Sequence, residues 1–246
     1  MEYATWSRAW KDARHDSTPI DRVLDLWRVR PPLDCRRESW PERGRAFRPL
    51  DKGYRKTGKR DQPAGEQVIE KALLGDRGSE REHRLRRGSQ ALTLKTYLHN
   101  MALSNVRTEQ VVADAFGILK VHRRFHPISI EVKVTDGGWW SAVVQCLQQV
   151  RMLRCNLPRL TSFCANHLDA PHAKGSWGMV LAPGSYFQKS AATRAKTCTL
   201  LDRLLKETQA RIILAESGSK STEWLQLHEL RYIAGHWPQR APNQSA

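Results

Sequence analysis

Residues 127–134 read PISIEVKV, and this stretch decides how we interpret the fold of the chain. Its isoleucines and valines alternate with Ser129, Glu131 and Lys133. Because successive side chains of a strand point to opposite faces, the pattern predicts a strand with one apolar face and one face that presents an acid beside a base. An Asp-Gly-Gly sequence at 136–138 follows and predicts a turn.

The segments around this strand alternate between helical and extended patterns. We predict helices at 66–74, 139–154, 195–208 and 223–234, and strands at 91–98, 111–119, 127–134, 177–182 and 211–215. This alternation predicts an α/β fold with a three-layer core, in which a central mixed sheet is flanked by helices and the later strands are buried on both faces.

The first 62 residues differ in composition from the rest of the chain, because they are rich in Arg, Trp and Pro. We predict that residues 1–62 form a basic, partly disordered N-terminal extension, in which residues 20–29 carry apolar side chains at helical spacing. The main domain is predicted over 63–237 and a flexible tail over 238–246. The basic stretch at 43–60 is interpreted either as an arm that contacts phosphates or as a solvated coil.

The charge balance favours a polyanionic partner. The 246 residues include 41 Lys and Arg against 25 Asp and Glu, which gives a formal net charge of +16. Such an excess is typical of proteins that bind DNA or RNA, although charge alone also fits a merely soluble basic protein. The five cysteines form no CxxC pair, which argues against a disulfide framework and against a thiolate zinc site.

The chain lacks the features of a membrane protein. No stretch approaches the ~18 consecutive apolar residues of a transmembrane helix. We therefore expect no membrane partner and a cytoplasmic location, with association to the nucleoid when the protein is bound to DNA.

A second acid completes a candidate metal site. Asp114 lies in the preceding strand-like segment, 17 residues before Glu131 (131 − 114). An antiparallel hairpin would bring the two carboxylates together, and two hard oxygen ligands suit Mg²⁺, for which Mn²⁺ can substitute. We predict that Asp114 and Glu131 hold the metal and that Lys133 orients or activates the attacking water.

The basic residues between the two acid-bearing segments form a further candidate site. Lys120, His122, Arg123, Arg124 and His126 fall in the predicted hairpin. They are interpreted either as phosphate contacts near the catalytic centre or as an exposed basic turn.

The order of these motifs resembles the PD-(D/E)XK nuclease superfamily over about residues 65–216. The matching elements are a helix with an acid, a strand with Asp114, a strand with Glu131-Val132-Lys133, and a helix with Gln145. The resemblance implies a restriction endonuclease-like core and a metal-dependent deoxyribonuclease, an endonuclease that hydrolyses phosphodiester bonds in double-stranded DNA. Restriction, defence and repair all use this chemistry.

The resemblance also implies two further catalytic residues. Gln145 matches the glutamine of the family's helix, and an acid of the first helix matches Glu66 in preference to Glu70. The chain departs from the family pattern at Ala113, where the motif has proline, and at Gln149, where some members place an aromatic residue.

Two other interpretations of the same residues stay open. An E-x-K tripeptide also occurs as a solvated charge pair, which would make the chain a non-catalytic nucleic-acid-binding or assembly protein on a nuclease-like fold. An RNA-processing nuclease would differ only in its substrate.

Cutting both strands of DNA with one site per chain would require a homodimer.

Overall fold

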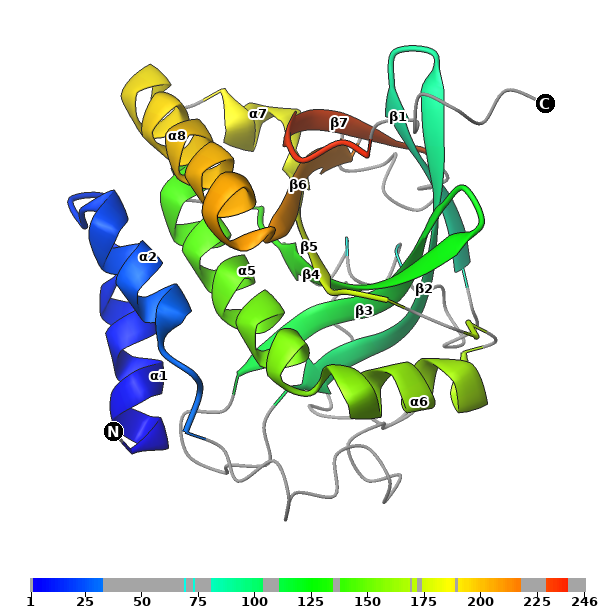
Figure 1. Cartoon of the computed structure of the whole chain (residues 1–246). Helices are drawn as coiled ribbons and strands as arrows, with labels where there is room; N and C mark the ends of the chain where they lie inside the picture. The colour runs from blue at the N-terminus through cyan, green and yellow to red at the C-terminus, as the bar shows by residue number, and fades with distance from the viewer. Residues whose placement is uncertain are drawn as a thin grey trace, which may run out of the picture.

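A computed structural model of the chain describes residues 2–32, 69, 73, 81–103, 111–134, 138–168, 170–171, 174–188, 190–217 and 229–238. Seven strands close into a barrel in which neighbours along the chain are also neighbours in space. They are β1 (Arg81–Arg87), β2 (Gln90–Ala102), β3 (Val112–Val121), β4 (Arg124–Val132), β5 (Trp177–Pro183), β6 (Arg211–Ser217) and β7 (Glu229–Gly235). Figure 1 shows the strands arranged as a ring.

The prediction of a three-layer core with an open central sheet flanked by helices was wrong, because β1 and β7 pair with each other. They pair in parallel, with Leu85 of β1 opposite Leu230 of β7. Both leucines are buried, and Arg86 binds Glu229 across the same pair at 2.7 Å. The first and last strands therefore join the two edges that an open sheet would leave exposed.

The two strands that close the barrel are those that the sequence pattern did not indicate. Strand β1 reads REHRLRR, in which His83 and Leu85 alone are buried among charged side chains. Strand β7 lies where we predicted a helix over 223–234, and residues 223–228 lie outside the described part of the chain. The five strands that we predicted are present as β2 to β6, with boundaries shifted by a few residues.

The strands contribute side chains to two separate hydrophobic cores, although β1 contributes only Leu85, to the inner one. The side chains that point inward fill the barrel, and those that point outward pack beneath the helices. The inner core includes Leu94, Leu119, Ile128, Ile130, Val132, Met179, Leu181 and Ile213, and the outer core includes Phe116, Ile118, Val180, Ile212 and Leu214. Ile69 and Leu73, two apolar positions of the helix predicted over 66–74, are helical and buried in the inner core.

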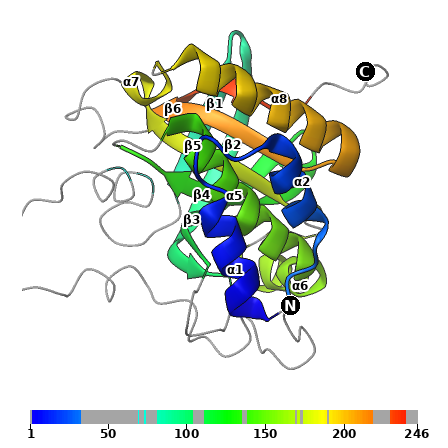
Figure 2. The same ribbon diagram turned by 90° about the vertical axis from the view of Figure 1, so that its left-hand side faces the viewer.

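The helices cover the outer surface of the barrel on one side (Figures 1 and 2). The long helices α5 (Gly138–Cys155) and α8 (Ala191–Thr208) contact the strands, while α1 (Tyr3–Asp12) and α2 (Ile20–Arg28) pack on α5. Two shorter helices, α6 (Leu157–His167) and α7 (Gly184–Phe187), follow α5 and β5 along the chain. Since α5 is enclosed between strands and helices, nearly every side of it is buried.

Glycine at position 178 allows α5 to lie close to the barrel. A Cβ atom on Gly178 of β5 would lie 2.5 Å from Sγ of Cys146 and 2.7 Å from Cγ2 of Val150, both on α5. Real Cβ atoms do not approach other atoms so closely, so a larger residue at position 178 would force these neighbouring side chains to move.

The first thirty residues belong to the packed structure. Trp6 and Trp10 of α1 are fully buried, and α2 confirms the helix that we expected from the apolar spacing of residues 20–29. The indole N–H of Trp140 in α5 donates to the backbone oxygen of Ala13 at 2.9 Å, which ties the end of α1 to α5.

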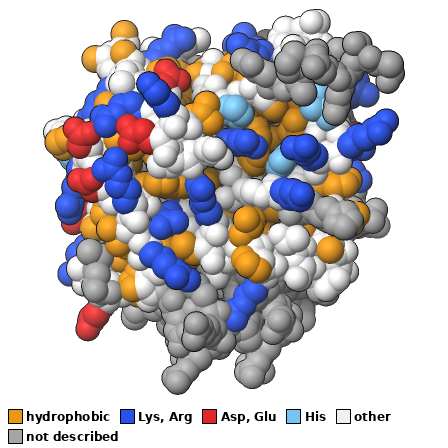
Figure 3. Space-filling model, in the orientation of Figure 1, with side chains coloured by type: hydrophobic (Ala, Val, Ile, Leu, Met, Phe, Trp, Pro, Cys, Tyr) orange, Lys and Arg blue, Asp and Glu red, His pale blue; other side chains and the backbone are white. Residues whose placement is uncertain are grey.

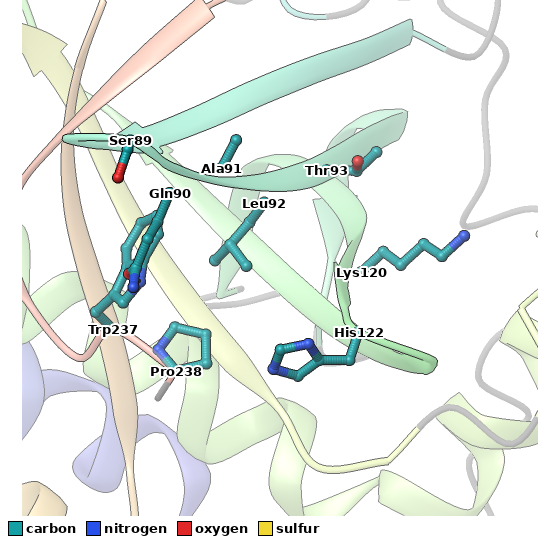
Figure 4. Close-up of a pocket in the computed structure, with 9 residues that line it drawn as sticks. All are labelled: Ser89, Gln90, Ala91, Leu92, Thr93, Lys120, His122, Trp237 and Pro238. Carbon is teal, nitrogen blue, oxygen red and sulfur yellow. The ribbon is translucent and has the colours of Figure 1, made fainter. Parts of the chain in front are cut away.

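One end of the barrel opens into a cavity of about 550 Å³ (Figure 4). Strand β2, the β3–β4 turn and the residues after β7 form its wall. His122 adopts a left-handed backbone conformation in that turn, with φ of 55°. Trp237 donates its indole N–H to Oε1 of Gln90 at 2.6 Å, which fixes the chain beyond β7 against β2.

A cluster of aromatic and basic side chains surrounds Trp177 at the start of β5. The ring centroids of His126 and His236 lie 5.5 and 5.1 Å from that of Trp177, and Cζ of Arg211 lies 5.2 Å from it. Burial, together with the positive charge of Arg211, lowers the pKa of His236 from 6.5 to about 4. The folded protein therefore resists protonation of this ring.

The lowered pKa of His236 predicts a loss of stability in acid. Because the unfolded chain binds this proton more readily, the free energy of unfolding falls as the pH drops from about 6.5 toward 4. Replacing His236 with glutamine removes this penalty, so the variant is expected to lose less stability than the wild type over the same range. Urea unfolding at several pH values measures the difference, and a difference that does not vary with pH would contradict the assignment.

Candidate active site

Asp114 and Glu131 lie on the neighbouring antiparallel strands β3 and β4. The register pairs Ala115 with Ile130, and its next step places Asp114 opposite Glu131. Both side chains share the outward face with Phe116 and Ser129, because side chains alternate along each strand. Oδ2 of Asp114 accepts a hydrogen bond from the backbone N–H of Val132 at 2.7 Å. The hairpin that we expected is present, and it places the two acids side by side.

Lys133 follows directly on β4. Its backbone N–H donates to the backbone oxygen of Leu181 at 2.9 Å, which extends the parallel pairing of β4 with β5 by one residue. Nζ of Lys133 lies 2.5 Å from Oε1 of Glu131. The side chain of Glu131 is 0% exposed and that of Lys133 is 17% exposed, so the acid is enclosed and the lysine reaches the surface.

Helix α5 places an amide against the buried acid. Nε2 of Gln149 donates to Oε2 of Glu131 at 2.5 Å and to the backbone oxygen of Val112 at 3.0 Å. The amide oxygen of Gln149 is buried and has no hydrogen-bond partner among the described residues. Gln145, which the family resemblance assigned to the site, instead accepts a hydrogen bond from Arg14 at 3.2 Å. The structure therefore brings Gln149 to Glu131 in place of Gln145.

Arg14, in the turn that follows α1, adds a second cation above the site. Its guanidinium donates to Oε1 of Gln145 at 3.2 Å and to Oε1 of Gln148 at 2.9 Å. Burial lowers the pKa of Arg14, and the negative charge of Glu131 partly offsets that shift. Sequence reasoning missed this residue, because Arg14 precedes Glu131 by 117 residues (131 − 14) in a segment that we interpreted as an extension.

The pKa of Glu131 is raised overall, because burial outweighs the neighbouring groups that favour its charged form. Burial raises the pKa of this carboxyl, while the charge and hydrogen bond of Lys133, the hydrogen bond from Gln149 and the charge of Arg14 all lower it. Cys146 lies beneath the same region, and burial, with the charges of Glu131 and Asp114, raises the pKa of its thiol well above 9.0. The thiol is therefore neutral and is a poor metal ligand here.

The residues at this position include oxygen donors of the type that a hard divalent cation prefers. Mg²⁺ is usually held by one or two carboxylates, with water and substrate phosphate as its other ligands. Asp114, Glu131 and the unpartnered amide oxygen of Gln149 supply such oxygens. Within the described ranges no cluster of three or more His, Cys, Asp or Glu residues could hold a metal. Glu66 and Glu70, the candidate acids of the first helix, lie outside the described residues.

The remaining expectations about the chain concern cysteines and membranes. Cys146, Cys155, Cys164 and Cys198 are free thiols, and Cys35 lies outside the described residues. Of the helices that the structure describes, none combines the length and the apolar character needed to cross a membrane.

Known proteins add no further constraint on the function. No family model matches the chain, and searches of curated proteins and of solved structures likewise find no match. The functional interpretation rests on the residues of the candidate active site.

Proposed function

We propose that this protein is a Mg²⁺-dependent nuclease that hydrolyses phosphodiester bonds in DNA. One observation carries the proposal: Asp114 and Glu131 occupy adjacent positions on neighbouring strands, and the Lys133 ammonium lies 2.5 Å from Glu131. Two carboxylates and a lysine in this arrangement match the needs of metal-assisted phosphodiester hydrolysis.

Each residue of the site has a separate role in this mechanism. Asp114 and Glu131 would hold the cation, which when bound neutralises charge on the scissile phosphate and lowers the pKa of a water molecule. The amide N–H of Gln149 holds Oε2 of Glu131 in place. Helix α5, which carries Gln149, covers the site on the outer side of the barrel. Lys133 is partly exposed, so its ammonium can orient the attacking water and offset the charge that develops in the transition state.

The basic character of the chain supports nucleic acid as the substrate. A net charge of +16 provides the electrostatic attraction that sequence-independent contacts to phosphates require. We infer double-stranded DNA as the substrate and a homodimer as the form that cuts both strands. Restriction, defence or repair would each use such an activity.

A non-catalytic binding protein is the second candidate. The observation that favours it is the enclosure of Glu131, which is 0% exposed and already paired with Lys133 and Gln149. A buried ion pair of this kind also occurs as a structural element, where its role is to fix the packing around it. The protein would then hold nucleic acid through its basic surface without turnover.

Cleavage assays with and without metal distinguish the two candidates. We expect supercoiled and linear DNA to be cut in Mg²⁺ or Mn²⁺ and to stay intact in chelator, while salt-dependent binding to DNA persists in both. The same assay on single-stranded RNA tests the RNA-processing alternative. Salt-dependent binding without cleavage of either nucleic acid in either metal would contradict the nuclease and support the binding protein.

A further inference from the structure

A second cavity, of about 310 Å³, lies where β4, β5 and β6 begin. Four basic side chains from four different parts of the chain line it: Arg124 from the start of β4, Arg154 from the end of α5, Lys174 from the segment before β5, and Arg211 from the start of β6. Val150 and Leu157 form part of its apolar wall. Cations that converge from separate elements on one cavity form a concave basic site, in contrast to a solvated run of charge along one helix.

The charges of these four side chains are not neutralised within the described residues. None of the ion pairs there involves Arg124, Arg154, Lys174 or Arg211. Burial lowers the pKa of Arg211, and the nearby charge of Arg124 lowers it further. The cluster therefore has an excess of positive charge that a bound anion would offset.

Trp177, one of the residues that line the cavity, carries a buried hydrogen-bond donor. Trp177 is 1% exposed, and its indole N–H has no acceptor among the described residues. A buried donor without an acceptor is destabilising, because it has lost its hydrogen bonds to water. An oxyanion in the cavity would supply both the missing acceptor and the missing negative charge.

The position of the cavity separates it from the candidate active site. Arg124 and Glu131 lie near opposite ends of β4, seven residues apart, which corresponds to about 23 Å along a strand.

Lys, Arg and His side chains are prominent on the face seen in Figure 3, whereas the acidic side chains in view gather toward its left-hand edge.

We propose that this cavity binds the phosphate of a nucleotide. The basic side chains would hold the phosphate oxygens, by forked hydrogen bonds in the case of Arg124 and Arg211, and the apolar wall would take the remainder of the ligand. A volume of about 310 Å³ exceeds the need of an inorganic anion and is at the lower end of the range for small-molecule sites. The nucleotide is either free in solution or the phosphorylated end of a nucleic acid strand.

Binding experiments test the site and distinguish the two sources of the phosphate. We would titrate the full chain, in chelator and about 0.15 M salt, with AMP and with a short single-stranded oligonucleotide that carries or lacks a 5′-phosphate. Tight binding of AMP indicates a free nucleotide. A 5′-phosphate that strengthens oligonucleotide binding, with weak binding of AMP, indicates a strand end.

Matched variants show whether the cavity is responsible. Arg124→Gln and Lys174→Ala are expected to weaken binding of the preferred ligand at least about 10-fold, because each removes a charged contact to phosphate. Arg123→Gln removes an exposed neighbour that does not line the cavity, and it is expected to bind as the wild type does. The titration is carried out in chelator, where the proposed nuclease has no metal, so a failure of the nuclease proposal leaves this test intact. Absence of phosphate-dependent binding, or equal weakening by Arg123→Gln, would overturn the proposal.

Discussion

Replacing Glu131 with glutamine is expected to lower the rate of metal-dependent DNA cleavage by at least about 100-fold. The change removes the negative charge that would hold the cation but preserves the shape of the side chain and an oxygen that can accept from Gln149. Single-turnover cleavage of a DNA duplex, with protein in excess, measures the rate of the chemical step directly.

A matched acid elsewhere in the chain provides the control for this prediction. Glu207 of α8 also takes part in ion pairs, with Arg28 at 3.1 Å and Arg203 at 3.2 Å, but it lies on the surface of the helical side. Glu207→Gln is expected to cleave at the wild-type rate, and both variants should keep their salt-dependent affinity for DNA. If Glu131→Gln cleaved as fast as Glu207→Gln, Glu131 and Lys133 would be a structural pair.

The second large effect concerns stability: replacing Trp140 with alanine is expected to lower the free energy of unfolding by about 3–5 kcal/mol. The indole is fully buried in α5, and Nζ of Lys196 lies 4.0 Å from its ring centroid. Truncation creates a cavity and leaves the backbone oxygen of Ala13 without its donor. Urea unfolding followed by circular dichroism measures the loss.

A more conservative substitution separates the causes of that loss. Trp140→Phe keeps an aromatic ring in the cavity but cannot donate to Ala13, so it is expected to cost clearly less than Trp140→Ala. Equal losses in the two variants would mean that the hydrogen bond to the end of α1, and not the volume of the ring, holds the helices together.

The local elements around the candidate site were predictable from the sequence. The alternation in 127–134 correctly indicated a strand and the apolar spacing of 139–154 a helix, since both patterns depend on residues close together in the chain. The turn predicted at 136–138 falls largely on residues 135–137, which lie outside the described residues. The antiparallel pairing of β3 with β4 followed from the short connection between them. The juxtaposition of Asp114 and Glu131 is a consequence of that pairing.

The sequence could not predict that the barrel closes, or which glutamine of α5 contacts Glu131. The pairing of residues 84–86 with 229–231 depends on tertiary packing, and β1 has too few apolar residues to show a period of two. Gln145 and Gln149 are four residues apart and share one face of α5. Which of them reaches Glu131 depends on the position of the helix over the barrel and on Arg14, which binds Gln145.

The pairing of β1 with β7 also sets the order in which the protein can assemble during synthesis. Leu85 and Leu230 are separated by 145 residues (230 − 85), so the ring cannot close until the ribosome has synthesised β7. The hairpin with Asp114 and Glu131, and the helix that covers it, emerge well before that point. In the interval, β1 and β6 each lack a partner strand on one edge, and unpaired edges of this kind promote pairing with other chains.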